Sequence, residues 1–383
     1  MRLLHISDLH IGKRVNEFSM IEDQKYILRQ ILAIADDQQA DGVMIAGDIY
    51  DKPVPSAEAV QVFDWFLTAL AVRGRQVYAV SGNHDSAERI AFGAQLMSGR
   101  GVFVSPVYQG ETAVFSVQDA YGELCIYLLP FVKPAVVRHA LEGAPDMDPN
   151  ALPESYQDAV RLAVERMGVD VRKRNVLIAH QFVTGAGRCD SEEVSVGGLD
   201  NVDADVFDVF DYVALGHIHS PQHLKRETVR YCGTPLKYSF SEAEQHKSVT
   251  VVELGEKGQV GISTVPLIPL HDMRRIRGTY LEVTARSFYQ DMDTEDYVQI
   301  TLTDEEDIPD GLQKLRIIYP NLMRLEYDNS RTKQNRFIEC AEETRQKSEL
   351  ELFAEFYALQ NNRPMSGEQS AFAAQLIGEC KEL

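Results

Sequence analysis

The feature that most constrains the fold of this chain is a set of five short apolar runs, each ending in a polar cluster. The runs span residues 3–6, 43–46, 77–80, 176–179 and 212–215. Such runs, rich in Val, Ile, Leu and Tyr, are typical of strands buried on both faces of a sheet. Stretches of helical periodicity lie at 21–34 and 57–70, the second with Ser56 as a candidate N-cap. Strands alternating with helices predict an α/β layered fold.

The polar clusters follow the runs directly. They are Asp8-Leu9-His10, Gly47-Asp48, Gly82-Asn83-His84-Asp85, the single His180, and Gly216-His217-Ile218-His219. We expect an extended backbone in the Asp-x-His and His-x-His pairs, which would put alternate side chains on one side. The glycines at the strand ends suit sharp turns and close backbone approach. Open α/β sheets place their functional sites at this edge, and the polar, Gly-rich segment 185–198 is expected to border it.

The chemistry of these clusters favours a pair of divalent ions. Carboxylate, imidazole and amide oxygen suit Mn²⁺, Fe²⁺ or Zn²⁺, and the absence of thiolates argues against structural zinc. The candidate ligands are Asp8, His10, Asp48, Asn83, His180, His217 and His219. They are too many for one ion with an open position, but they suffice for two if one carboxylate bridges. Taken singly, His180 could be a hydrogen-bonded core histidine and Asp48 a cap, but five such clusters at strand ends favour a dinuclear centre.

The pattern changes after Pro266. Short runs at 280–283, 297–301, 312–315 and 322–325 predict a small domain of strands with one or two helices. A helical pattern from about Phe337 ends at Asn361-Asn362-Arg363-Pro364, and a second short helix is expected around 372–377. We therefore expect three parts, at residues 1–268, 269–335 and 336–383.

Net charge and cysteine usage bear on partners and compartment. The formal net charge is −20, whereas proteins that bind nucleic acids usually carry a basic patch. Composition alone therefore argues against DNA, unless bound cations or a partner subunit supply the positive field. Five scattered cysteines without CxxC spacing predict reduced thiols, and no apolar stretch suits a membrane span or a signal peptide. We expect a cytoplasmic location.

The five clusters, in this order, resemble the calcineurin-like metallophosphoesterase superfamily over residues 1–265. The longer stretches at 5–13, 47–51, 82–86, 216–222 and 231–236 are similar to the SbcD family, bacterial nucleases that trim DNA double-strand breaks. The resemblance implies a layered β-sandwich flanked by helices, a small α+β capping domain and a C-terminal helical tail.

The resemblance also implies roles for individual residues. Asp8, His10, Asp48 and His219 would hold one ion, and Asp48 would bridge to a second ion held by Asn83, His180 and His217, with Mn²⁺ the expected metal. His84 would protonate the leaving oxygen, and Asp85 would orient the loop or His84 itself. Lys13, Arg14 and Arg89 are candidate phosphate contacts. Archaeal relatives carry a histidine where this chain has Asp51, which puts a phosphate-clamping role there in doubt.

The implied activity is DNA hydrolysis, as a 3′–5′ double-strand exonuclease and a single-strand or hairpin endonuclease in repair, recombination and replication. An SbcC-type coiled-coil ATPase would dock on the C-terminal helices and supply basic surface, and a homodimer is expected. One alternative is a phosphatase or cyclic-nucleotide phosphodiesterase of the same superfamily, which would not need the long C-terminal extension. Another is a non-catalytic DNA-end scaffold, which would be expected to have lost ligands.

Overall fold

A computed structural model describes residues 1–144, 147–148, 152–192, 201–330, 332, 349–361 and 364–381. The chain divides into two compact units, Met1–Asp272 and Met273–Leu383. The helix predicted to begin near Phe337 starts outside the described residues. Within the described ranges, no helix combines the length and the hydropathy needed to cross a membrane.

The first unit is built on two six-stranded sheets. The first sheet has the order β14-β13-β1-β4-β5-β6, and the second has the order β11-β12-β10-β9-β8-β7. The strands of the first sheet are β1 (Arg2–Ile6), β4 (Gly42–Ala46), β5 (Gln76–Val80), β6 (Val102–Val104), β13 (Ser248–Leu254) and β14 (Val260–Pro266). Those of the second are β7 (Ala113–Asp119), β8 (Gly122–Leu129), β9 (Arg174–His180), β10 (Tyr212–Gly216), β11 (Gln222–Leu224) and β12 (Arg226–Tyr231). The five predicted strands are confirmed as β1, β4, β5, β9 and β10.

Parallel pairing gathers the polar clusters at one edge of each sheet. β1 pairs with β4 and β4 with β5 in parallel, and so do β8 with β9 and β9 with β10. Alternate residues of both sheets, such as Met44, Tyr78, Ile126 and Ile178, pack into one buried core between them. The sandwich therefore brings the carboxyl ends of strands from both sheets together.

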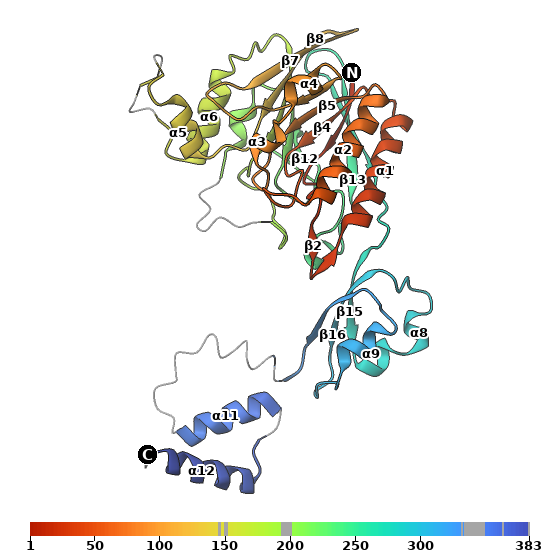
Figure 1. Ribbon diagram of the computed structural model, residues 1–383, viewed down its shortest axis with the longest axis vertical. Helices are drawn as coiled ribbons and strands as arrows, with labels where there is room; N and C mark the ends of the chain where they lie inside the picture. Colours follow the sequence, from red (N-terminus) through yellow and green to blue (C-terminus); the bar gives the residue numbers. More distant parts are fainter. Residues whose placement is uncertain are drawn as a thin grey trace. The chain divides into compact units, whose positions relative to one another are not determined.

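Helices cover the two outer faces of the sandwich (Figure 1). The paired helices α1 (Ile21–Asp37) and α2 (Ala57–Val72) lie against the first sheet, with α2 on β5. The Ser56 hydroxyl caps α2 by accepting a hydrogen bond of 3.2 Å from the Ala59 N–H, as predicted. On the second sheet, α5 (Pro134–Leu141) and α6 (Tyr156–Arg166) bury Val137, Ala159 and Val160. The expected layered β-sandwich flanked by helices is confirmed.

Short elements occupy the connections. They are β2 (Arg14–Val15), β3 (Phe18–Ser19), α3 (Ala87–Ile90), α4 (Ala94–Ser98), and the 3₁₀ turns η2 (Ala204–Phe207) and η3 (Phe240–Glu242).

The second unit contains a three-stranded parallel sheet. Its strands are β15 (Met273–Gly278), β16 (Tyr297–Leu302) and β17 (Leu322–Tyr327), and its short helices are α7 (Tyr280–Val283), α8 (Arg286–Tyr289) and α9 (Gly311–Arg316). The run at 280–283 is helical because Thr279 and Glu282 form a reciprocal capping box. Two further helices, α11 (Glu349–Asn361) and α12 (Gly367–Lys381), contact each other, and the Gln369 amide donates to the Tyr357 hydroxyl at 2.9 Å.

Candidate metal centre

The turns that carry the predicted ligands have unusual backbone angles. Asp8, His10, Asp48 and His217 have φ of +53°, +44°, +47° and +101°. The expectation of an extended backbone at Asp8, His10 and His217 is therefore wrong. Residues with a Cβ rarely adopt positive φ, and such conformations persist where surrounding contacts impose them, often at functional sites. Here the side chains are aimed by sharp turns, not by strand alternation.

Two glycines allow the edges of the two sheets to approach each other closely. A Cβ on Gly216 would lie 1.8 Å from the Ala46 carbonyl oxygen, and one on Gly47 would lie 2.3 Å from Nδ1 of His180. Gly47 also has a φ of +87°. No other residue fits at either position without moving backbone or a candidate ligand, so the expected role of these glycines is confirmed.

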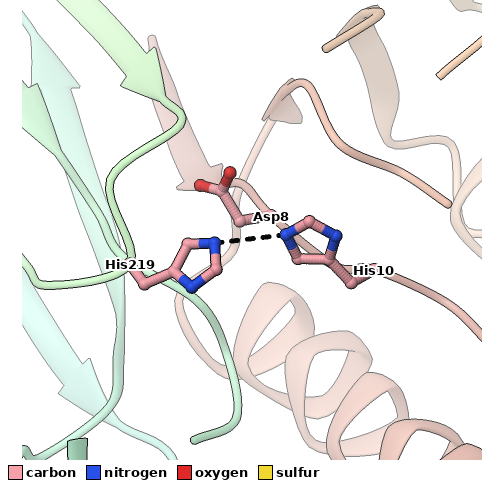
Figure 2. Close-up of side chains that lie close together, drawn as sticks. All are labelled: Asp8, His10 and His219. Atoms are coloured by element: carbon pink, nitrogen blue, oxygen red, sulfur yellow. Dashed lines mark hydrogen bonds between the residues drawn. The ribbon is translucent and has the colours of Figure 1, made fainter. Parts of the chain in front are cut away.

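One group of ligands, here called the His219 side, comprises Asp8, His10 and His219 (Figure 2). Their ligand atoms all lie within 4.8 Å of one another, and the Nε2 atoms of His10 and His219 are 3.2 Å apart. The Asp8 carboxylate accepts the His217 N–H at 3.0 Å, and all three side chains are buried. Two imidazole nitrogens and a carboxylate that converge in this way suit a divalent cation.

A second group, the His180 side, comprises Asn83, His180 and His217. The Asn83 Oδ1 lies 2.9 Å from Nε2 of His180 and 2.9 Å from Nδ1 of His217. Nδ1 of His180 lies 2.8 Å from the Ala46 carbonyl, which can only accept a hydrogen bond. That nitrogen therefore carries a proton, and Nε2, which faces Asn83 and Asp48, is the atom that a metal ion would bind.

Asp48 lies between the two sides. Its Oδ2 is 3.4 Å from Nε2 of His180 and 3.8 Å from Nε2 of His10. Its Oδ1 accepts the backbone N–H of His84 at 2.9 Å. One carboxylate oxygen thus faces ligands of both sides, as a bridging ligand would.

Burial and mutual charge set the protonation of the centre. Burial raises the pKa of Asp8 to about 7, against the attraction of His180. Burial also opposes ionisation of Asp48, but the charge and hydrogen bond of His180 and the charges of His10 and His84 outweigh it, so the pKa of Asp48 lies below its usual range. Burial lowers the pKa of both His10 and His219, so these rings are neutral. Burial disfavours a charged His180, but the charge and hydrogen bond of Asp48 outweigh it and raise the pKa of His180 to about 9. Metal binding on that side would therefore displace a proton from the ring, because a ligating imidazole must be neutral.

His84 occupies the solvent side of the centre. Its Nδ1 lies 3.0 Å from the Asp51 carbonyl, and its Nε2 lies 3.9 Å from Oδ2 of Asp48. The side chain is 15 % exposed, so a bound molecule could reach it. The Asp51 carbonyl can only accept, so Nδ1 carries a proton, and Nε2 is the ring nitrogen on the side of Asp48.

The Asp85 carboxylate fastens two motif loops together. It accepts the backbone N–H groups of Ile49, Tyr50 and Gly82 at 3.0, 2.9 and 2.9 Å. Burial, followed by the nearby Asp48 charge, raises the pKa of Asp85 to about 6. These contacts join the loop after Asp48 to the loop that begins at Gly82, and both predicted roles of Asp85 stay predictions.

The three candidate phosphate contacts are placed differently. Lys13 lies near the centre, where its Nζ contacts Oδ1 of Asp51 at 2.8 Å and the side chain is 14 % exposed. The same Asp51 oxygen is 3.9 Å from Nδ1 of His10. Arg14 and Arg89 are exposed, and the Arg14 guanidinium donates to the Glu17 carbonyl.

Sequence patterns did not identify two residues that hold the first motif turn. The Gln24 amide donates to the His10 carbonyl at 2.8 Å and accepts the Gly12 N–H at 2.9 Å, and the Tyr238 hydroxyl donates to the Leu9 carbonyl at 2.5 Å. A polar Gln24 on the buried stripe of α1 was a signal available in the sequence, because such groups need partners. Tyr238 gave no local signal.

Comparison with known proteins places the chain in a family. Residues 1–221 match the calcineurin-like phosphoesterase model, and residues 269–361 match the model described as the type 5 capsule protein repressor C-terminal domain, SbcD_C. The SbcD subunit of nuclease SbcCD from Staphylococcus epidermidis is 31% identical over 331 residues, which is 85% of each chain.

Two solved structures share a weaker likeness. A Thermus thermophilus protein is 13% identical with a TM-score of 0.39, and the match covers 69% of this chain and 98% of that one. A dimetal phosphatase from Danio rerio is 11% identical with a TM-score of 0.43, covering 70% and 96%. TM-scores this low do not assign the chain to a family, so the family assignment rests on the sequence matches. On those matches, the chain belongs to the calcineurin-like phosphoesterases and, within them, to the SbcD family of nuclease subunits.

Proposed function

We propose that this chain hydrolyses DNA phosphodiesters with two divalent metal ions, as the nuclease subunit of an SbcCD-type complex. The observation that carries the proposal is the Asp48 carboxylate, which faces two groups of oxygen and nitrogen ligands where strand ends of both sheets meet. The similarity to the SbcD subunit of an SbcCD nuclease over 85% of both chains supports DNA as the substrate.

In this proposal Asp8, His10, Asp48 and His219 hold one ion, and Asp48, Asn83, His180 and His217 hold the other. The donor set fits divalent ions, because it offers carboxylate, amide oxygen and neutral imidazole and no thiolate. The donor set suits Fe²⁺ and Zn²⁺ as well, and Mn²⁺ is proposed because the resemblance to the SbcD family implies it. When bound, the ions supply Lewis-acid chemistry that polarises the phosphate and lowers the pKa of a water molecule.

His84 acts as the proton donor to the leaving oxygen. The Asp51 carbonyl holds Nδ1–H at 3.0 Å, so the proton that is transferred resides on Nε2, on the side of Asp48. Asp85 supports this step by fixing the loop that carries His84 to the loop that follows Asp48. Lys13, Arg14 and Arg89 are proposed as phosphate contacts, with Lys13 closest to the centre.

The proposed partner is an SbcC-type ATPase that binds the C-terminal helices. Exposed aromatic side chains support this, with Phe353 44%, Phe356 57% and Phe372 62% exposed. A partner with basic surface also offsets the net charge of −20. Within the complex we propose a homodimer, 3′–5′ double-strand exonuclease and single-strand or hairpin endonuclease activity, and a cytoplasmic location. The three-part division at 268/269 and 335/336 is retained as part of this proposal.

The test is hydrolysis of a labelled blunt duplex and of a single-stranded oligonucleotide with Mn²⁺, with and without the ATPase and ATP. We expect His84→Gln to lower cleavage by about 10²- to 10⁴-fold at unchanged metal content, because a general acid contributes that much. His223→Gln, which alters an exposed histidine of β11, is the matched control.

Duplex processing that needs both partner and ATP supports the whole proposal. Cleavage that His84→Gln leaves intact contradicts the role of His84. Robust turnover of small phosphoesters or phosphoproteins with no cleavage of either DNA points instead to a phosphatase. Ion binding without hydrolysis of any phosphoester points to a scaffold.

A further inference from the structure

His219 is held at three points by polar residues outside the ligand set. The Ser191 hydroxyl lies 2.6 Å from ring Nδ1, and the Glu192 carboxylate accepts the backbone N–H at 2.7 Å. The Lys247 ammonium donates to the backbone carbonyl at 2.9 Å. Glu192 and Lys247 are 8% and 5% exposed, so these contacts are shielded from water. Buried polar groups arranged in this way fix both the position and the ring of His219.

A buried ion pair stands behind Ser191. The Ser191 hydroxyl donates to Oε1 of Glu242 at 2.6 Å, and Oε2 of Glu242 accepts from Nζ of Lys247 at 2.6 Å. Glu242 is fully buried, and it also accepts the Tyr238 N–H at 3.2 Å. An ionised carboxylate can only accept hydrogen bonds, so the single hydroxyl proton of Ser191 is committed to Glu242.

This commitment determines where His219 carries its proton. Ser191 has no second proton, so toward His219 its oxygen can only accept, and Nδ1 of the ring must be the donor. A neutral imidazole has one N–H, so Nε2 is left with its lone pair. Nε2 is the atom that faces His10 and Asp8 (Figure 2). The contact therefore prepares the nitrogen that a metal needs.

We propose that Ser191 is a positioning residue for the ion of the His219 side, setting the tautomer and pose of His219 through the relay Ser191–Glu242–Lys247. The inference rests on the two-metal function proposed above and deepens it. It makes the affinity of one ion depend on the surface segment 185–192, which follows β9. The segment is also fastened by paired amide contacts between Gly187 and Gln222, both 2.9 Å, and by the Asp190 N–H to the Ser241 hydroxyl at 3.1 Å.

The test uses the full chain with Ser191→Ala, Ser191→Thr and a matched control, Ser241→Ala. The control removes a hydroxyl that holds the same segment through Asp190 without contacting the His219 ring. Mn²⁺ affinities are measured by electron paramagnetic resonance titration. Loss of an outer-shell partner lowers metal affinity by about 10- to 100-fold. Ser191→Ala should therefore lower the affinity for one of the two Mn²⁺ ions by at least about tenfold. Ser191→Thr and Ser241→Ala should bind both ions as the parent chain does.

A second readout needs no metal. Nitrogen-15 spectra of histidine-labelled, metal-free protein, assigned with His219→Gln, should show His219 protonated at Nδ1 in the parent chain and a tautomer mixture in Ser191→Ala. An Nε2–H tautomer in the parent chain, unchanged Mn²⁺ affinities in Ser191→Ala, or equal weakening by Ser241→Ala would each overturn the inference. Because the parent spectrum suffices on its own, misfolding of Ser191→Ala does not block the test. Two bound ions without DNA cleavage would sink the proposed nuclease function and leave this inference standing.

Discussion

The two sides of the metal centre present similar ligand atoms but are supported by different parts of the fold. On the His180 side, Nδ1 of His180 is held by the carbonyl of Ala46, a backbone group of β4 in the middle of the first sheet. On the His219 side, Nδ1 of His219 is held by the Ser191 side chain, on a connection after β9. The second histidine of each side differs as well, because His217 stacks on the Phe131 ring at an angle of 14° whereas the His10 turn is held by Gln24.

This difference indicates at which positions a substitution can change the affinity for one ion without affecting the other. A backbone carbonyl survives every substitution of its own side chain, so the His180 side should tolerate changes around it. The His219 side rests on side-chain groups, each of which one mutation can delete. We therefore expect outer substitutions to act on one ion selectively, and the predictions below are ways to break or sharpen this contrast.

The largest effect is expected where both sides meet. Asp48→Asn removes the charge that faces both sides, so both ions should be lost together, and hydrolysis should fall on the order of 10³-fold because several kcal/mol of charge stabilisation depend on them. Metal content of the purified protein, measured by elemental analysis alongside DNA cleavage, checks this. Retention of one ion would show that the two sides are independent.

A second large effect should fall on stability. Gly216→Ala would place a Cβ 1.8 Å from the Ala46 oxygen, in the strand edge that supports the His180 side. We expect the free energy of unfolding to drop by about 3 kcal/mol, the upper range for overpacking. Urea unfolding of the metal-free protein measures it, with Gly99→Ala as control, since a Cβ there meets only the Leu96 carbonyl oxygen at 3.6 Å. Equal stability of the two variants would show that the backbone at the sheet edge moves to accommodate the added Cβ at little cost in free energy.

The strands beneath the centre carry a buried histidine that should make stability depend on pH. Burial lowers the pKa of His5 from 6.5 to about 3, although the Leu215 carbonyl opposes this. Below pH 6.5, His5 is therefore protonated in the unfolded chain but stays neutral in the folded chain. The contribution of neutral His5 to the free energy of unfolding is constant above pH 6.5. As the pH falls from 6.5 to 5, the free energy of unfolding should decrease by about 2 kcal/mol. The pH dependence of unfolding should flatten in this window in His5→Gln, and an unchanged slope would rule out His5 as the source.

Gln24→Leu should act on one side only. It deletes the hydrogen bonds to the His10 carbonyl and from the Gly12 N–H. We expect Mn²⁺ affinity on the His219 side to fall about tenfold, as for other outer-shell partners, with the His180 side unchanged. Gln61→Leu, on the exposed face of α2, is the control in the same titration. An equal loss of Mn²⁺ affinity on both sides would show that Gln24 does not support the His219 side selectively.

Phe131→Leu should give the smallest effect, because it removes aromatic contacts alone, the ring being stacked on His217 at 6.4 Å and edge-on to His180 at 6.1 Å. An aromatic contact of this kind is worth about 0.5–1.5 kcal/mol, so the affinity on the His180 side should change by only about threefold, near the lower end of that range. Calorimetric Mn²⁺ titration measures the change. A loss as large as that of Gln24→Leu would show that aromatic packing supports the His180 side as strongly as side-chain polar contacts support the other.

Sequence patterns predicted the sheet edge well because its signals are local. The buried strands show as apolar runs, and each ligand follows a run directly, as Asp8 follows β1 and His180 ends β9. Strands such as β12 and β14 were not predicted, because neither forms a continuous buried run: β12 has two buried residues, and β14 has only half-buried and exposed ones.

The remaining features depend on contacts between distant residues. Positive φ at Asp8 and His10 cannot be read from two residues, since partners such as Gln24 and Tyr238 impose it. The Gly-rich composition of segment 185–198 indicates a place beside the site, but nothing local singles out Ser191. Its role exists only because Glu242 and Lys247 are brought to it from η3 and the turn before β13.

The sequence separation within the centre has a consequence for how the protein is made. His10 and His219 are 209 positions apart in the chain, and His180 and Asn83 are 97 apart. Closing such long loops lowers the entropy of the chain before favourable contacts form to compensate for the loss. These pairs therefore form late in folding. A growing polypeptide offers no complete two-ion centre until β10 has been synthesised and has joined its sheet. Metal uptake should therefore report chains whose first unit has folded, and chains that end before His219 should remain inactive toward phosphoesters in the cell.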